Sequence, residues 1–185
     1  MKNLILLIAV CFAFQSYAQD TQNDSYTIQR LIIYNAEGKI LLEKHKNGWM
    51  TPALRHNTKV STNDGLNSLA SEFGLKTSSP QLAGIFTFIP EYKPQSSFRQ
   101  HYKSKVVGGI LKTPKGKLDA QWFSPKKAIE MMSLPETKLI LAIRDMTKHI
   151  LNHPDEMWAG TFLLWKENEK THYKTTEAFY SISKN

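Results

Sequence analysis

Short runs of apolar residues, separated by turns and polar loops, dominate the chain and are typical of a strand-rich domain. The turn Asn35–Gly38 separates the first two runs, and the segment Pro90–Gln100, with two prolines and several polar residues, predicts a loop. Gly108 and Gly109 lie in the last run and predict a bulge or a close approach of two backbone segments. The runs that predict strands are Tyr26–Tyr34, Ile40–Lys44, Pro80–Ile89 and Tyr102–Lys112.

One short helix is predicted between the second and third strands. Ser61 and Asp64 form a capping box, in which side chains satisfy the free amide hydrogens at a helix start. Gly74 stands where a left-handed C-terminal cap is usual. The apolar positions at helical spacing are Leu66, Leu69, Ala70 and Phe73. We therefore expect one face of this helix to pack against a core.

The C-terminal part of the chain predicts a long helix and a hairpin. Pro135–Ile150 has the spacing of an amphipathic helix. Beyond it, Trp158–Lys166 and His172–Tyr180 predict two strands around a polar turn. We expect this aromatic-rich hairpin to cover one edge of the domain.

The N-terminus has the layout of an export signal. A short positive start precedes the unbroken apolar run Leu4–Phe14, and Ser16 and Ala18 are small residues where a signal peptidase reads the chain. The run is shorter than the roughly 20 residues that span a bilayer, which favours a cleaved signal over an anchor. We predict that residues 1–18 are removed, that residues 19–25 form a flexible terminus, and that the mature protein is periplasmic or secreted without membrane insertion.

Composition narrows the class of partner. The chain has a formal charge of +8, and its one cysteine, Cys11, lies inside the predicted signal, so disulfides and cysteine-based zinc sites are not expected. His149 and His153 have zinc-ligand spacing, but without a third ligand they are interpreted as a helix end. The positive charge fits an anionic small molecule or envelope polymer. Scattered lysines without interleaved aromatic residues argue against nucleic acid. The sequence leaves the oligomeric state open.

The predicted short helix and the loop before it form a motif over Trp49–Leu75, which resembles the signature of the Nudix hydrolase family. That signature reads Gly, five residues, Glu, seven residues, then Arg-Glu-U-x-Glu-Glu-x-Gly-U, where U is aliphatic. Aligned from its C-terminal end, the motif matches at Leu69, Glu72, Gly74 and Leu75. It differs at Ala53, Lys59, Asn67, Ser68 and Ser71. The segment Leu118–Pro125 extends the resemblance, because Nudix domains commonly place a Trp-Phe strand here, followed by a short helix that matches Lys126–Met131. The resemblance predicts a Nudix-like domain over residues 26–150, with a hairpin extension over 151–185.

The resemblance implies a fold and a chemistry. The implied fold is α/β (α+β), with a mixed β-sheet sandwiched between helices. In the family, glutamates of the helix and loop hold Mg²⁺ against a pyrophosphate, because magnesium requires several hard oxygen ligands. Here the matching positions are Ser68, Ser71 and Glu72, with Lys59 in the loop. We therefore expect no metal cofactor; if the protein is active, Glu72 is the remaining catalytic and metal-binding residue and Mg²⁺ or Mn²⁺ the metal.

Other residues are candidates for ligand binding. Arg55, His56 and Lys59 form a basic loop that favours an anion. In the family, variable loops supply the substrate contacts, and the matching segments here are Lys44–Gly48 and Pro90–Gln100. The candidate pocket residues in or beside these loops are Trp49, Tyr92, Arg99 and His101.

Three functions fit these observations. The main hypothesis is an exported Nudix-fold protein with a degenerate, inactive motif that binds a ligand or partner. The alternative is a divergent metal-dependent hydrolase of (nucleoside) diphosphate-linked substrates that recruits acids from outside the motif. The candidate acids are Glu91, Asp119 and Glu130. The third is a surface protein that binds anionic envelope polymers through its hairpin, where Trp165 and Tyr173 are available for stacking.

Overall fold

The structure, a computed structural model, describes residues 26–56, 59–134 and 141–183, so the predicted signal and flexible terminus lie outside the described residues. Ten strands and three helices are formed within these ranges. The strands are β1 (Thr27–Tyr34), β2 (Ile40–His45), β3 (Gly48–Met50), β4 (Ala53–His56), β5 (Leu75–Thr77), β6 (Gln81–Pro90), β7 (Ser97–Gly109), β8 (Asp119–Phe123), β9 (Trp158–Glu167) and β10 (Lys170–Ser181). The helices are α2 (Thr62–Glu72), α3 (Pro125–Met131) and α4 (Ala142–Asn152).

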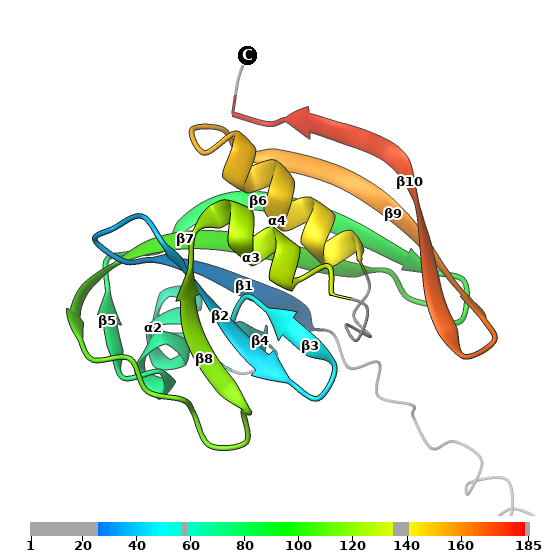
Figure 1. The fold of residues 1–185 in the computed structure, drawn as a ribbon. Coiled ribbons are helices and arrows are strands. Elements are labelled where there is room, and N and C mark those ends of the chain that lie inside the picture. The colour runs from blue at the N-terminus through cyan, green and yellow to red at the C-terminus, as the bar shows by residue number, and fades with distance from the viewer. Residues whose placement is uncertain (1–25, 57–58, 135–140, 184–185) are drawn as a thin grey trace, which may run out of the picture.

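The ten strands form one mixed sheet. Its main path runs β10–β9–β6–β7–β1–β2–β3, while β4, β5 and β8 pair with β1, β7 and β2. β1 lies parallel to β7, and β9 lies parallel to β6. Figure 1 shows α3 and α4 packed together against one part of the sheet, with α2 apart from them and next to β5. This arrangement confirms the predicted mixed sheet between helices.

Each face of the sheet has its own apolar core. Leu31 and Ile33 of β1 point to the side of α2, whereas Ile32 points to the side of α3 and α4. Because successive strand residues point to opposite faces, Arg30 shares the face of Ile32 and Gln29 shares the face of Leu31. The core beside α2 also contains Leu66, Leu69, Ala70 and Phe73. The core beside α3 and α4 also contains Phe86, Ala128, Met146 and Phe162.

The predicted short helix and its caps are confirmed. Ser61 is the N-cap of α2, and its Oγ accepts a hydrogen bond from the Asp64 amide at 3.1 Å. Gly74 follows the helix with a φ of +74°, and a Cβ there would lie 2.4 Å from the carbonyl oxygen of Ile110. Gly109 has a φ of +93°, and a Cβ there would lie 2.2 Å from the carbonyl oxygen of Gly74. The close backbone approach predicted from the paired glycines therefore holds the end of α2 against β7.

Two predicted boundaries are wrong. The predicted loop Pro90–Gln100 is strand at its end, because β7 begins at Ser97, where it pairs with β6, and also pairs with β1 from Arg99 onward. Backbone hydrogen bonds on two sides define this polar segment, which carries no apolar pattern. β7 also ends at Gly109 rather than Lys112. Of the predicted helix Pro135–Ile150, residues 135–140 lie outside the described residues, and α4 covers most of the remainder.

The predicted C-terminal hairpin is formed by β9 and β10 and is part of the main sheet. β9 pairs with β6, and its Phe162 and Leu164 belong to the core beside α3 and α4. The Tyr173 hydroxyl donates to Asp145 of α4, and burial together with this hydrogen bond raises the pKa of Tyr173 to about 12. Tyr173 thus fastens the hairpin to α4. The division of the chain at residue 150 stays a prediction. None of the helices in the described ranges has the length and apolar character needed to cross a membrane.

Candidate functional site

The motif helix carries little chemistry on its outer face. Ser68, Ser71 and Glu72 are exposed on α2, and Lys59 is exposed in the loop before it. The Ser71 hydroxyl donates to the Asn67 carbonyl oxygen at 2.8 Å, so it is used within the helix. The described part of the chain contains no group of three or more His, Cys, Asp and Glu side chains arranged to hold a metal. One carboxylate among hydroxyls and an ammonium does not fit a magnesium ion, which requires several oxygen ligands.

The acids outside the motif are used locally. Glu91 is exposed just beyond β6. Asp119 accepts hydrogen bonds from the backbone and side chain of the two residues after it, at 2.7 and 2.6 Å. Glu130 pairs with Lys127 on α3 at 3.1 Å. Within the described residues, the structure does not bring any two of these acids together with Glu72 into a metal-binding group.

A group of cationic side chains lies on the sheet face opposite α2. Arg55 of β4 and Arg99 of β7 are both Cα partners of Ile28 in the strand between them, so all three side chains leave the same face. Arg30 and His101 pair with each other two residues further along β1 and β7 on that face. We call Arg30, Arg55, Arg99 and His101 the arginine cluster.

Arg30 is the buried member of the arginine cluster. Its side chain is 5% exposed, and its Nη1 donates to the Thr51 carbonyl oxygen at 2.9 Å. Burial and, to a lesser extent, the charge of Arg99 lower its pKa to about 10, while Glu43 opposes the shift. Glu43 itself pairs with two neighbouring side chains at 2.9 and 2.8 Å. The Arg30 guanidinium therefore stays charged at neutral pH. The negative charge of Glu43 compensates this positive charge only in part, because Glu43 also pairs with two other side chains.

Arg99 connects the buried part of the arginine cluster to the surface. Its guanidinium carbon lies 4.8 Å from the centroid of the Phe88 ring. Burial lowers its pKa, while the nearby phenols of Tyr26 and Tyr92 oppose that shift. Its buried Nε has no hydrogen-bond partner, and it forms no ion pair with the described residues. Arg55 lies alongside, with its guanidinium carbon 3.5 Å from the Tyr26 ring centroid.

His101 is fully buried, with Arg30 and Arg99 on one side and the aromatic core on the other. Its pKa is lowered to about 3 by burial, then by the charges of Arg30 and Arg99, with the backbone of Arg99 opposing the shift. The ring is therefore neutral at neutral pH, and it meets Phe86 edge-on at 5.4 Å between centroids. Neither ring nitrogen has a hydrogen-bond partner of normal geometry in the described structure. Buried polar groups without a partner are rare, and each one calls for an explanation.

The structure brings together some of the predicted binding residues and separates others. Arg55, Arg99 and His101 lie in the arginine cluster, with Tyr92 near Arg99. Trp49 does not line a pocket there: it is 5% exposed and packs edge-on against a core aromatic ring, Phe123, with centroids 5.1 Å apart. Lys59 is exposed beside the motif helix. Sequence analysis missed Arg30, whose signal is a single charged residue inside the apolar run of β1.

The histidine pair and the hairpin aromatics have structural partners. His153 caps the end of α4, and its ring lies 4.5 Å from that of His149. The His149 ring meets Trp158 edge-on at 4.2 Å, which ties α4 to the start of β9. Trp165 stacks on His172 across the hairpin at 5.6 Å. The interpretation of the two histidines as a helix end is confirmed.

Solved structures similar to this one come from the family that the motif resembles. A MutT protein from Bacillus halodurans aligns at a TM-score of 0.59 and 18% identity, covering 87% of this chain and 100% of its own. A NUDIX hydrolase from Nitrosomonas europaea aligns at 0.59 and 14%, covering 78% and 81%. This protein has a Nudix fold. An ADP-ribose pyrophosphatase from Streptococcus suis aligns with it at 0.52 and 15%, covering 74% and 98%. No family model and no curated protein matches the sequence.

Within the Nudix fold, the residues that match the signature divide by role. Leu69 and Leu75 are buried in the core beside α2. Gly74 allows the backbone contact with Ile110. Of these residues only Glu72 is exposed, and its side chain forms no ion pair with another described residue. The motif therefore retains the residues that build the helix and its cap, while the arginine cluster lies across the sheet.

Proposed function

We propose that this Nudix-fold protein is exported and binds a phosphate-bearing small molecule at the arginine cluster, without hydrolysing it through the motif helix. The observation that carries the proposal is the set of buried, unpartnered nitrogens of Arg99 and His101 beside the charged Arg30. An anion at this position would supply hydrogen-bond acceptors to these groups and offset the mutual repulsion of the guanidinium groups.

The geometry of the arginine cluster favours phosphate over a simple halide. A guanidinium presents a planar fork of N–H donors that matches two oxygens of a phosphate. Arg55 and Arg99 flank Ile28 on the strands either side of β1 and leave the same face of the sheet. The neutral His101 ring adds one N–H donor and one acceptor, depending on its tautomer. Phe88, Tyr26 and Tyr92 supply aromatic surface beside the arginines.

Export rests on the sequence of residues 1–18, with a positive start, an apolar run and small residues before the predicted cleavage point. Outside the cytoplasm, the ligand would be an anionic small molecule or the end group of an anionic envelope polymer. The chain's formal charge of +8 raises the local concentration of either one.

The test uses the mature chain, residues 19–185. Binding of pyrophosphate and ADP-ribose is measured by calorimetry in EDTA. Hydrolysis of the diphosphate bond is measured with Mg²⁺ and with Mn²⁺, as phosphate from pyrophosphate and as AMP and ribose 5-phosphate from ADP-ribose. We expect saturable binding in EDTA and no hydrolysis. Hydrolysis that disappears in Glu72→Gln would establish the alternative, a divergent metal-dependent hydrolase. No binding by a sample that unfolds cooperatively on heating would refute the proposed function.

A further inference from the structure

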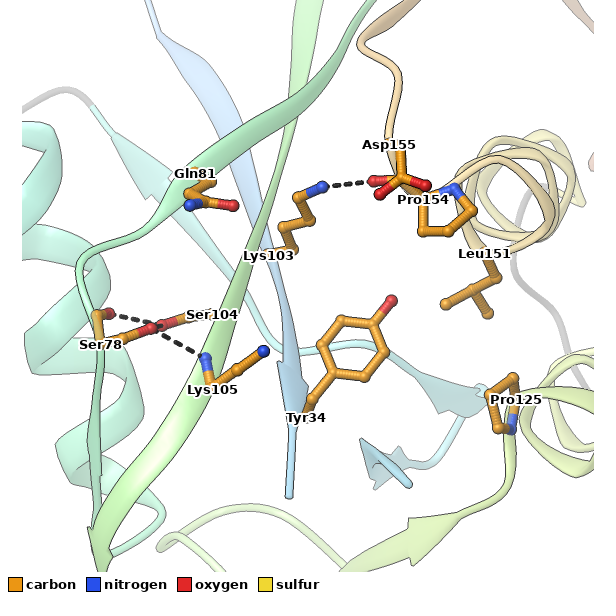
Figure 2. A pocket seen from close by; sticks show the side chains of 10 residues that line it. All are labelled: Tyr34, Ser78, Gln81, Lys103, Ser104, Lys105, Pro125, Leu151, Pro154 and Asp155. Atoms are coloured by element: carbon orange, nitrogen blue, oxygen red, sulfur yellow. Dashed lines mark hydrogen bonds between the residues drawn. The ribbon is translucent and has the colours of Figure 1, made fainter. Parts of the chain in front are cut away.

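A cavity lies at the other end of β1 from the arginine cluster. It has a volume of about 600 Å³ and is formed where the sheet face meets the ends of two helices. Tyr34, the last residue of β1, projects into it between Lys105 and Leu151, as Figure 2 shows. Cavities of roughly 300–1,000 Å³ are the size that holds small molecules in proteins.

The two walls of this cavity differ in chemistry. The sheet supplies a polar wall, with Lys103 and Lys105 on β7 and Gln81 on β6. The helix side supplies an apolar wall, with Leu151 at the end of α4 and Pro125 at the start of α3. The Lys103 ammonium donates to the carbonyl oxygen of Pro154, which joins the two walls at one side (Figure 2).

Several polar groups of the cavity are available to a ligand. The Tyr34 hydroxyl forms no hydrogen bond with the described residues, and burial raises the Tyr34 pKa, so it is a donor at neutral pH. Neither Lys103 nor Lys105 takes part in an ion pair in the described part of the chain. Asp155 is the one carboxylate in the lining, so the lysines outnumber the acids. The cavity therefore favours an anion.

We propose that this cavity binds a small organic anion, with a carboxylate or phosphate at the lysine wall and an apolar ring or chain at the opposite wall. The anionic group accepts hydrogen bonds from Lys105, from the free N–H groups of Lys103 and from the Tyr34 hydroxyl. The apolar part packs against Leu151 and Pro125. The site is separate from the arginine cluster, which lies near the start of β7, and it does not depend on the function proposed there.

The test is an NMR titration of the ¹⁵N-labelled mature chain with phenyl phosphate, 3-phenylpropionate and inorganic phosphate. We expect the amide signals of Lys103, Lys105, Leu151 and Asp155 to shift with phenyl phosphate or with 3-phenylpropionate. Comparing these two compounds shows whether the cavity binds a phosphate or a carboxylate head group. Inorganic phosphate, which lacks the apolar part, should bind these residues at least about tenfold more weakly. Equal binding of inorganic phosphate, or no shift of these amides with either organic anion, would overturn the proposal.

Two variants test the named contacts. Lys105→Ala and Tyr34→Phe should each weaken phenyl phosphate binding at the cavity by several-fold or more, because each removes one donor to the anion. Lys174→Ala removes another exposed lysine, on β10, and should leave the affinity unchanged. An equal loss of affinity in Lys174→Ala would show that the anion responds to the net charge of the protein and not to this cavity, which would overturn the proposal. Shifts of Arg99 and His101 report the arginine cluster separately, so the failure of one site is distinguishable from failure of the other.

Discussion

Both faces of the central sheet carry an apolar core, and they differ in where the cationic side chains lie. On the side of α2, Leu31 and Phe73 lie in the core, and the polar residues of the helix point to solvent. On the other side, Arg30 and His101 are buried, and both ring nitrogens of His101 lack a hydrogen-bond partner. The motif that resembles a catalytic signature therefore contributes packing residues, while the arginine cluster lies across the sheet. A fold and its motif do not by themselves locate the function.

The largest effect should come from the apolar side of the motif helix. Phe73 is fully buried, and Phe73→Ala should lower the free energy of unfolding by about 3–5 kcal/mol, since it removes a ring and leaves a cavity. Glu72→Gln, one residue away on the exposed face, should change it by less than about 0.5 kcal/mol. Urea denaturation of both variants measures the contrast. A loss of stability in Glu72→Gln as large as that in Phe73→Ala would break the comparison between the packing and polar sides of α2.

The opposite face should show a pH dependence that comes from His101. Its folded pKa of about 3 lies below the unfolded value, so as pH falls below about 6.5 the unfolded chain binds a proton that the folded chain rejects. This contribution to stability is present at neutral pH and is lost progressively as pH falls toward 3. Each unit of the shift corresponds to about 1.4 kcal/mol.

The variant His101→Phe isolates this contribution. Between pH 6 and 4, the native chain should lose up to about 1.4 kcal/mol per pH unit more than the variant does, measured by chemical denaturation at each pH. Equal slopes in the two proteins would mean that burial and the charges of Arg30 and Arg99 do not hold His101 neutral.

A smaller loss of stability is expected from substitutions of two glycines with left-handed backbones. Comparing them separates the cost of the backbone conformation from the cost of the close contact at the end of α2. Gly74→Ala should lose about 1–2 kcal/mol from its left-handed backbone and more from the contact with Ile110. Gly38→Ala is the matched control, because Gly38 has a φ of +73° but no atom within 4 Å of the added Cβ. Thermal unfolding should rank Gly74→Ala below Gly38→Ala. Equal losses would show that the contact between α2 and β7 relaxes freely.

Local sequence signals predicted the elements better than they predicted the site. The caps of α2 and the close approach of Gly74 and Gly109 follow from local chemistry, and both are confirmed. Arg55 and Arg99 were expected in loops, whereas they meet because β4 and β7 flank β1, a long-range pairing that spacing does not encode. Arg30 was hidden inside an apolar run.

The misplaced residues have the same cause. Trp49 follows a variable loop in the sequence, but its strand alternation turns the ring toward Phe123 and the core. Ser97 begins a strand although the loop before it is polar, because β7 pairs with β6 from Ser97 and with β1 from Arg99. Tyr173, expected to be available for stacking, instead donates to Asp145. In each case a partner distant in sequence decides the position.

The central claim is that anion binding belongs to the arginine cluster and not to the motif helix. The most direct measurement is the affinity of the mature chain for pyrophosphate in EDTA, compared with those of Arg99→Gln and Glu72→Gln. We expect Arg99→Gln to weaken binding by about tenfold or more, about 1.4 kcal/mol, and Glu72→Gln to change it by less than about twofold. Binding that requires Mg²⁺ and is lost in Glu72→Gln, while Arg99→Gln binds normally, would contradict the account.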